Sequence, residues 1–378
     1  MPKVCFYFQV HQPMRLSNYS AFSKNYFSNP KNEEVFKRVC RKCYIPANSL
    51  MLDLINKYNG QFRFSFSITG TFIEQAKMFN PEVIESFREL VKTGCVDLLD
   101  ETYYHSLAFL ISEKEFTEQI RMHRRLMKKE FNYSPSVFRN TEAMYSNKVA
   151  EIAKQMGYKA VVAEGWEKYL GWRSPNYVYC APSGINLLLR NYKLSDDIGF
   201  RFSARSWNEF PLTADKYASW LSTCPGEIVN LFIDYETFGE HQWQETGIFE
   251  FLRHLPAEVL KYQHMSFAKL NETALETPVA ELSMPDVISW ADIDRDLSAW
   301  LGNNIQQKAF EFLKSFDGKL KGKALELWRK LQTSDHFYYM CTKWFADGDV
   351  HKYFNAYDTP YDAYINYVNV LQDLQKSV

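Results

Sequence analysis

The sequence predicts an α/β fold over residues 1–284, followed by a helical C-terminal region over residues 285–378. Two observations predict this organisation. Short apolar runs rich in β-branched and aromatic residues recur between residues 4 and 234, and amphipathic stretches with helical spacing separate most of them. After about residue 285, long amphipathic patterns replace the strand-like runs. Strands that alternate with helices pair in parallel through right-handed crossovers, which gives a barrel or an open doubly wound sheet.

The strand-like runs favour the barrel. They number seven and cover residues 4–10, 62–69, 95–99, 136–139, 159–163, 186–190 and 228–234. Helices are expected over residues 81–93, 114–131 and 147–156. An open sheet usually carries a glycine-rich phosphate loop after its first strand, whereas this first strand runs into His11-Gln12-Pro13. The open sheet remains the alternative. In the C-terminal region, helical patterns cover residues 290–316, 321–333 and 358–375, and we expect them to pack against the barrel.

Composition and charge exclude several classes of protein. The chain has 378 residues, of which 46% are hydrophobic and 16% aromatic, so it can bury a large core and is not disordered. With 44 Lys+Arg against 45 Asp+Glu, the net charge of -1 gives no electrostatic support for a nucleic-acid or membrane-surface partner. We find neither a signal peptide nor an apolar run of the roughly 18 residues that a membrane-spanning helix needs. A cytoplasmic protein is expected, and its oligomeric state is left open.

The cysteines favour the same compartment. Seven are scattered along the chain without a framework, which is typical of reduced thiols. Cys40 and Cys43 form a Cys-x-x-Cys pair, but no second pair lies at the spacing of a zinc site. We therefore expect neither a metal nor a cofactor, with a metal or redox role for this pair as the weaker alternative.

Potentially catalytic side chains follow most of the strand-like runs. In an α/β barrel the chemistry is built at the carboxyl ends of the strands, where the connecting loops converge. Each side chain also has a structural interpretation, such as a hydrogen-bonded histidine or a carboxylate at a helix start. The candidates are His11, Glu74, Glu101, His105, Glu142, Glu164, Asp234, Glu236 and His241.

Asp234 and Glu142 are the strongest of these candidates. Asp234 ends the most apolar run in the chain, where a carboxylate must be solvated by a cleft, paired or metal-bound. Arg139 and Asn140 precede Glu142 and could hold the chain around a reactive carboxylate. Two carboxylates in one cleft suit glycoside chemistry, because one must stay ionised while the other protonates the leaving oxygen. Tryptophans could stack on the sugar rings, although any single tryptophan could equally pack in the core.

Five ordered segments resemble the motifs of glycoside hydrolase family 57, and they match its α-amylase-type members most closely. The segments lie at residues 8–13 (FQVHQP), 69–75 (TGTFIEQ), 138–142 (FRNTE), 234–241 (DYETFGEH) and 290–303 (WADIDRDLSAWLGN). The resemblance implies an incomplete seven-stranded (β/α) barrel followed by a helical bundle. It also implies retaining chemistry on α-1,4-glucans such as starch, glycogen and maltodextrins.

The resemblance also implies roles for individual residues. Glu142 matches the catalytic nucleophile and Asp234 the general acid/base, and retention requires their carboxyl groups to lie roughly 5 to 5.5 Å apart. His11 matches a histidine that contacts the sugar, and Gln9 stands where many members carry another histidine. Glu74 falls in the second motif, with either a structural or a substrate-binding role.

The remaining substrate-binding candidates are His105, Glu236 and His241, together with Trp290 and Trp300 of the fifth motif. Both tryptophans lie on the segment that resembles the family's cleft-closing element.

Other functions stay open at this point. Transfer to a second glucan, or branching, shares the first half-reaction with hydrolysis. A carbohydrate deacetylase could gather Asp234, His11, His105 and His241 around a divalent metal, although the histidines lack the usual local spacing. A glucan-binding protein without catalysis is the non-enzymatic alternative.

Overall fold

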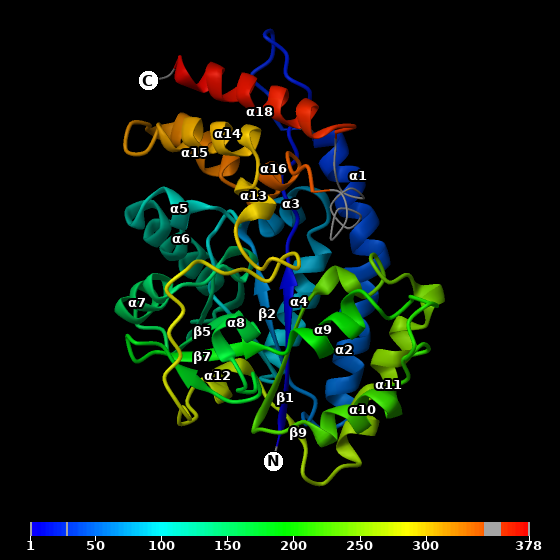
Figure 1. Cartoon of the computed structure of the whole chain (residues 1–378). Coiled ribbons are helices and arrows are strands. Elements are labelled where there is room, and N and C mark those ends of the chain that lie inside the picture. Colours follow the sequence, from blue (N-terminus) through cyan, green and yellow to red (C-terminus); the bar gives the residue numbers. More distant parts are fainter. Residues whose placement is uncertain (1, 28, 344–356, 377–378) are drawn as a thin grey trace.

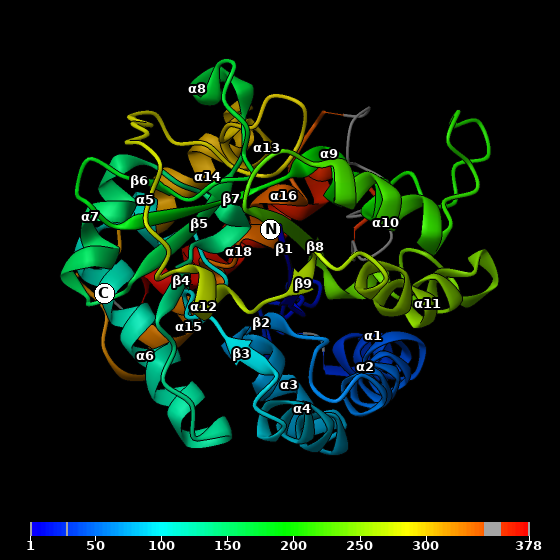
Figure 2. The same ribbon diagram turned by 90° about the horizontal axis from the view of Figure 1, so that it is seen from below.

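The computed structural model describes residues 2–27, 29–343 and 357–376. It has an α/β fold with the helices outside two β-sheets (Figure 1 and Figure 2). Each of the seven predicted runs contains a strand, and two short strands, β6 and β9, were not predicted. The strands are β1 (Lys3–Val10), β2 (Phe64–Ile68), β3 (Val96–Leu98), β4 (Val137–Arg139), β5 (Ala160–Glu164), β6 (Tyr179–Cys180), β7 (Asn186–Arg190), β8 (Ile228–Asp234) and β9 (Ser266–Phe267).

The first sheet has the strand order β3-β2-β1-β8, with β9 beside the start of β1, and all of its pairs are parallel. The second sheet has the order β4-β5-β7-β6, in which only the short β6 is antiparallel. The register places Gln9 of β1 opposite Ser67 of β2 and Asp234 of β8. Three polar side chains therefore lie in one row at the carboxyl ends of neighbouring strands.

The strands do not form one closed sheet, so the barrel predicted from the strand count is not confirmed. The two sheets meet at both edges through a few contacts. Asp100, just beyond β3, bridges Phe138 of β4. At the other edge, the Asn191 amide after β7 donates to the Asn230 carbonyl of β8, and the Asn230 side chain donates to the Leu189 carbonyl, both at 2.9 Å. Among the described strands, no ladder joins the two sheets.

Alternate residues of β1 pack into two different cores, as the two-residue period of a strand requires. Phe6 and Phe8 pack outward with other aromatic rings, including Phe66 of β2, against the helices that cover the first sheet. Cys5 and Tyr7 pack inward with residues from both sheets. Many of the aromatic residues thus pack in the core.

The helices surround the strands (Figure 2). The predicted helices at 81–93, 114–131 and 147–156 are confirmed as α4, α6 and α7. The helices before residue 285 are α1 (Asn29–Val39), α2 (Ile45–Lys57), α3 (Gly70–Phe79), α4 (Glu82–Lys92), α5 (Ala108–Ile111), α6 (Glu113–Phe131), α7 (Asn147–Gln155), α8 (Glu167–Leu170), α9 (Tyr192–Gly199), α10 (Ala214–Thr223), α11 (Ile248–Leu260) and α12 (Leu270–Thr273), with a π-helix at Cys40–Tyr44 and 3-10 turns at Thr141–Ala143, Tyr235–Thr237 and Gln244–Thr246.

The C-terminal region is helical, and it lies at the end of the molecule toward which β1 points (Figure 1). Its helices share a hydrophobic cluster that also takes in Leu107 and Met144 from the loops after β3 and β4. They are α13 (Ser298–Leu301), α14 (Asn304–Lys314), α15 (Gly322–Leu331), α16 (Ser334–Tyr338) and α18 (Pro360–Gln375). Within the described part of the chain, no helix is long and apolar enough to cross a membrane.

The prediction of helix over residues 290–316 is wrong for its first part. Residues 290–297 are irregular, and helix begins only at Ser298. Asp292 and Arg295 have φ angles of 64° and 47°, in the left-handed region that no α-helix contains. The carboxylate of Asp296 accepts a hydrogen bond from the Ser298 amide at 2.8 Å, a local contact that competes with helix formation.

Candidate active site

A cavity of about 460 Å³ opens at the carboxyl ends of the strands. Eight of the ten predicted site residues line it. They come from the ends of β1 and β8, from the loops after β3 and β4, and from the irregular segment that begins at residue 290. These residues are Gln9, His11, His105, Glu142, Asp234, Glu236, His241 and Trp290.

Glu142 occupies a strained turn directly after β4. Its φ and ψ angles are 56° and 27°, and Ala143 follows with a φ of 48°, so two residues with side chains lie consecutively in the left-handed region. Such conformations cost free energy and cluster at functional sites. Both carboxylate oxygens accept hydrogen bonds. The indole Nε1 of Trp290 donates to Oε2 at 3.0 Å, and the Ser334 hydroxyl donates to Oε1 at 2.9 Å. These donors favour the ionised form of the carboxylate.

A cationic histidine faces the same carboxylate. The Nε2 atom of His105 lies 3.4 Å from Glu142 Oε1, and its Nδ1 atom lies 2.8 Å from Oε2 of the fully buried Glu101. Burial disfavours the imidazolium, but the hydrogen bonds and negative charges of Glu101 and Glu142 outweigh it and raise the pKa of His105 to about 9. His105 is therefore positively charged at neutral pH.

Glu101 fixes the position of His105 through their hydrogen bond. Its Oε1 atom accepts from Gln9 Nε2 at 2.9 Å and from the Ser67 hydroxyl. Burial opposes its ionisation, but the hydrogen bond and charge of His105, with the nearby Arg139, lower the pKa of Glu101 to about 2. The other end of the Gln9 amide accepts from the Tyr7 hydroxyl at 2.6 Å. Although Gln9 borders the cavity, its amide is thus engaged in supporting Glu101.

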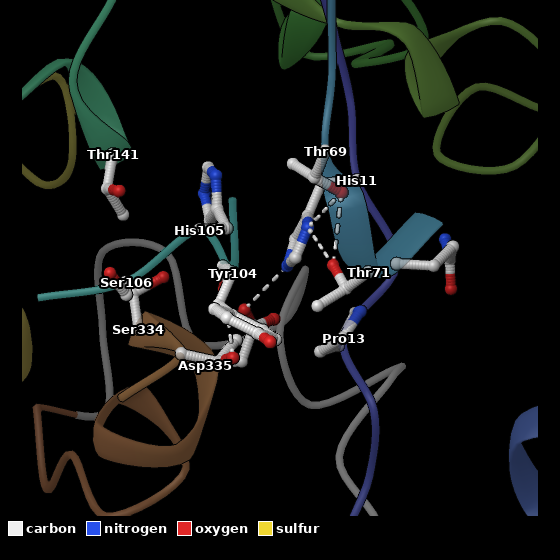
Figure 3. Close-up of polar contacts among 12 residues, drawn as sticks. His11, Pro13, Thr69, Thr71, Tyr104, His105, Ser106, Thr141, Ser334 and Asp335 are labelled. Atoms are coloured by element: carbon white, nitrogen blue, oxygen red, sulfur yellow. Dashed lines mark hydrogen bonds and ion pairs between the residues drawn. The ribbon is translucent and has the colours of Figure 1, made fainter. Parts of the chain in front are cut away.

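His11 stacks on His105, with ring centroids 4.1 Å apart and an interplanar angle of 24°. Figure 3 shows its ring between β1 and helix α16, with Thr69 and Thr71 on one side and Asp335 on the other. Nδ1 lies 3.0 Å from the Thr69 hydroxyl and Nε2 lies 2.9 Å from Asp335 Oδ2. Burial and the charge of His105 lower the pKa of His11 despite Asp335, so the ring is neutral.

Asp234 reaches the cavity from β8 of the first sheet, whereas Glu142 follows β4 of the second sheet. Asp234 is the last residue of β8 and is half-buried, and its neighbour Glu236 is 5% exposed. Burial and the charge of Asp234 raise the pKa of Glu236 to about 8, although hydrogen bonds from the Tyr44 hydroxyl and the His11 amide oppose this. Glu236 is therefore mostly protonated at neutral pH. Asp234, which is half-buried, is the more exposed carboxyl group of the pair.

Trp290 covers a buried cation. The Arg139 side chain is fully buried, and its Cζ atom lies 4.6 Å from the centroid of the Trp290 ring. None of its three guanidinium nitrogens has a hydrogen-bond partner among the described residues. The stacked indole is thus a major favourable contact of this guanidinium, and the same ring borders the cavity.

Sequence comparison places the chain in a family. Residues 5–285 match the sequence model of Glycosyl hydrolase family 57, the family that the five motifs resemble. The chain belongs to this family. The predictions of a family 57 glycoside hydrolase and of an α-amylase-like enzyme are thereby confirmed.

A relative of Methanocaldococcus jannaschii named “Putative alpha-amylase” is 50% identical over 394 residues, which span 98% of this chain and 84% of the relative. A Pyrococcus horikoshii alpha-amylase is 24% identical over 166 residues, or 44% of this chain and 23% of that protein.

Two solved structures share the fold. A branching enzyme of Pyrococcus horikoshii superposes with a TM-score of 0.70 at 13% identity, covering 100% of this chain and 94% of that chain. A 4-alpha-glucanotransferase of Thermococcus litoralis gives a TM-score of 0.65 at 16% identity, covering 89% of this chain. This chain spans only 56% of the length of the glucanotransferase.

Two predicted site residues of this family 57 chain lie away from the cavity. Glu74 accepts from the Tyr103 hydroxyl at 2.9 Å and pairs with Lys330 at 3.4 Å, so it links α3 to the C-terminal helix α15. Trp300 is 1% exposed and packs beside Tyr338 in the C-terminal cluster. The sequence signal placed Trp290 and Trp300 in one motif, but the irregular segment between them separates their surroundings.

Several residues at the cavity were not predicted. Arg190 at the end of β7 pairs with Glu164 at 3.1 Å and with Asp196 at 2.6 Å. Asp335 and Ser334 arrive from helix α16, outside the residues that match the family. A polar residue at a strand end was a usable signal for Arg190, whereas nothing in the helical pattern marks Ser334 or Asp335.

Among residues 2–27, 29–343 and 357–376, no group of three His, Cys, Asp or Glu side chains is arranged to hold a metal ion. Cys40 and Cys43 are buried on the π-helix, and burial raises the pKa of both thiols. All seven cysteines are free.

Proposed function

We propose that the chain is a retaining glycoside hydrolase that cleaves α-1,4-glucans such as starch, glycogen and maltodextrins. One observation carries the proposal: Glu142 and Asp234 border the same cavity from the carboxyl ends of strands in two different sheets. Their surroundings differ in the way that a nucleophile and a proton donor require. Glu142 faces two neutral donors and a cationic histidine, whereas the neighbouring carboxyl groups of Asp234 and Glu236 together hold a proton at neutral pH that can be passed to the leaving oxygen.

In the proposed reaction, a Glu142 oxygen attacks the anomeric carbon of the bound sugar. The glycosidic bond breaks, and Asp234 gives its proton to the departing oxygen, so that a glycosyl ester of Glu142 forms. Asp234, now a carboxylate, then takes a proton from water while the water oxygen attacks the anomeric carbon. The ester bond breaks, Glu142 leaves as a carboxylate and Asp234 is reprotonated.

The charge distribution of the site suits this sequence. The imidazolium of His105 lies beside Glu142 and is itself neutralised by Glu101, so the nucleophile stays ionised without leaving an uncompensated buried charge. Fixed donors and charges of this kind stabilise a reacting carboxylate without reorganisation during the reaction. His11 borders the cavity with both ring nitrogens engaged by Thr69 and Asp335, so it is proposed to contact the sugar through its ring carbons. His241 and Trp290, which border the same cavity, are proposed to contact the substrate as well.

The choice of substrate is supported by the relatives. The named alpha-amylases match this chain in sequence, and the structures with the same fold are named a 4-alpha-glucanotransferase and a branching enzyme. A cavity of about 460 Å³ is in the range that accommodates a small ligand, which here is a segment of the glucan around the cleaved bond.

We also infer an architecture for this site. The two sheets are proposed to act as an incomplete barrel of seven parallel strands, which is supported by their contacts at Asp100 and Asn230. Residues 1–284 would form the catalytic domain, and residues 285–378 a helical domain that closes the cleft. A cytoplasmic location remains a prediction, and the free thiols suit a reducing compartment.

Transfer to another glucan, or branching, is the second candidate function, because two structures with this fold carry those names. Incubation with maltoheptaose and with glycogen, followed by chromatography, separates the possibilities. Short products alone indicate hydrolysis, products longer than maltoheptaose indicate transfer, and new α-1,6 links indicate branching. We expect short products.

The variant Glu142→Gln tests the proposed nucleophile. It should lose nearly all glucan cleavage and still bind maltoheptaose, because the side chain keeps its shape and loses only its charge. The matched control is Glu151→Gln, at an exposed position on α7. Persistent activity of Glu142→Gln would show that another group is the nucleophile.

A further inference from the structure

Helix α16 reaches the catalytic cavity from the C-terminal region. Its first two residues contact two different parts of the site. The Ser334 hydroxyl donates to Glu142 Oε1 at 2.9 Å. Asp335 Oδ2 lies 2.9 Å from His11 Nε2 (Figure 3). Ser334 is fully buried and Asp335 is 9% exposed. Since Glu142 follows β4 and His11 follows β1, two adjacent side chains touch residues carried by both sheets.

Backbone contacts fix α16 against the loop that carries His105. The Ser334 amide donates to the His105 carbonyl, and the Leu107 amide donates to the Gln332 carbonyl, both at 2.9 Å. Between them, the Thr333 hydroxyl donates to the Tyr104 carbonyl at 2.9 Å. The start of α16 is therefore held in a fixed position relative to His105, which itself faces Glu142.

We propose that Ser334 is a positioning residue for Glu142, that Asp335 is a positioning residue for His11, and that helix α16 thereby completes the catalytic site. The proposal rests on the proposed function, in which Glu142 is the nucleophile. The Ser334 hydroxyl holds one orientation of the Glu142 carboxylate. It leaves the second lone pair of Oε1 and those of Oε2 for the remaining contacts and for attack.

Asp335 selects the tautomer of His11. A carboxylate only accepts hydrogen bonds, so the neutral His11 ring carries its proton on Nε2, next to Asp335. Nδ1 is then an acceptor, and the Thr69 hydroxyl can donate to it across 3.0 Å. The ring orientation is fixed from both sides, which is how an outer residue commonly positions a functional histidine.

The first test compares Ser334→Ala with Ser334→Thr in the full chain. Loss of a hydrogen bond to a charged group should lower kcat on maltoheptaose by about 10- to 100-fold and change KM by less than about threefold. The acidic limb of the kcat/KM profile should move to higher pH, because the ionised carboxylate loses a donor. Ser334→Thr keeps the hydroxyl and should recover most of kcat. Both variants keep the charged groups around this carboxylate. His105 faces Glu142, Glu101 pairs with His105, Arg139 lies near Glu101, and Asp335 pairs with the neighbouring His11.

A matched control separates positioning from folding. Thr273→Val removes a buried hydroxyl on α12 that donates to the Leu270 carbonyl and lies outside the cavity. This variant should lower the Tm and keep the wild-type kcat and pH profile. The proposal for Ser334 is overturned if Ser334→Ala keeps kcat and its acidic limb, or if Thr273→Val reproduces both changes.

The second test does not depend on activity. In the nitrogen-15 NMR spectrum of the wild-type protein, His11 should appear as one neutral tautomer with its proton on Nε2. Asp335→Asn, whose amide can donate or accept, should give a mixture of tautomers. A wild-type proton on Nδ1, or an unchanged tautomer in Asp335→Asn, contradicts the role of Asp335. A wild-type protein that cleaves no glucan would contradict the proposed function instead, and the NMR result would still decide the tautomer.

Discussion

His11 and His105 stack face to face, with ring centroids 4.1 Å apart, and they differ in charge. The pKa of His105 is raised to about 9 by its two carboxylate partners, which overcome its burial. The pKa of His11 is lowered by burial and by the charge of His105. The charge of His105 thus adds to burial in keeping His11 neutral. The site contains a charged histidine beside the proposed nucleophile and a neutral one on the side of β1.

The His105–Glu101 pair should make stability depend on pH. The folded-state pKa of His105 lies above its ordinary value of 6.5, so its contribution is complete below about pH 6.5 and is lost as the pH rises through about 9. A shift from 6.5 to about 9 corresponds to roughly 3 kcal/mol. Urea unfolding of wild type and of His105→Gln at pH 6 and pH 10 measures it. The difference in unfolding free energy between the two proteins should shrink toward pH 10, and a constant difference would show that His105 is not protonated in the folded state.

Glu236 should make stability fall with rising pH as well, over a range that begins at lower pH than for His105. Burial and the Asp234 charge raise the pKa of Glu236 from 4.5 to about 8, so the folded protein holds this proton more tightly than the unfolded chain. The wild type therefore loses stability relative to Glu236→Gln as the pH rises from about 4.5 to 8, by on the order of 5 kcal/mol. Unfolding at pH 5 and pH 9 tests this. A relative stability that stays flat would mean that Glu236 ionises normally.

Trp290 should contribute to catalysis through its indole nitrogen. Trp290→Phe loses the donor 3.0 Å from Glu142 Oε2 but keeps a ring over Arg139. We expect kcat to fall by about 10- to 100-fold, because a hydrogen bond to a charged group is lost. Trp290→Ala should also destabilise the fold, since Arg139 loses its stacking partner. Trp243→Phe, at a position outside the cavity and 54% exposed, is the control, and equal kinetics in all three variants would contradict the assignment.

Trp300 should behave as a packing residue. It is 1% exposed and its indole nitrogen has no hydrogen-bond partner among the described residues. Trp300→Phe should lower the unfolding free energy by about 1 to 3 kcal/mol through lost volume and leave KM for maltoheptaose unchanged. Thermal unfolding and steady-state kinetics check the two parts. If Trp300→Phe clearly raised KM and kept the wild-type stability, Trp300 would be a substrate-binding residue.

The strands and the two main carboxylates could be predicted from the sequence because their signals are local. The run 228–234 is apolar until it ends at Asp234, and the structure has a strand with the same bounds. Polar residues after such runs gather at one end of the sheets, which is why Glu142, His11 and His105 line one cavity.

The contributions of Ser334 and Asp335 could not be predicted in this way. Ser334 lies 192 positions from Glu142, and Asp335 lies 324 positions from His11. They meet only because the backbone after α15 pairs with the loop after β3. An amphipathic pattern says which face of a helix is buried, but not which loop that face meets. The burial of Trp300 away from the cavity could not be predicted for a related reason. The left-handed turns at Asp292 and Arg295 break the predicted helix.

The identity of the nucleophile is tested most directly by trapping the covalent intermediate. A 5-fluoro-α-glucosyl fluoride forms a glycosyl-enzyme that hydrolyses slowly, and mass spectrometry of a digest locates the attached sugar. If Glu142 is the nucleophile, one fluoroglucosyl group should be added per chain, on the carboxylate of Glu142 in the peptide that follows β4. A label on Asp234 or on another residue would contradict this assignment. So would an enzyme that cleaves maltoheptaose and accumulates no label, because an inverting mechanism forms no covalent intermediate.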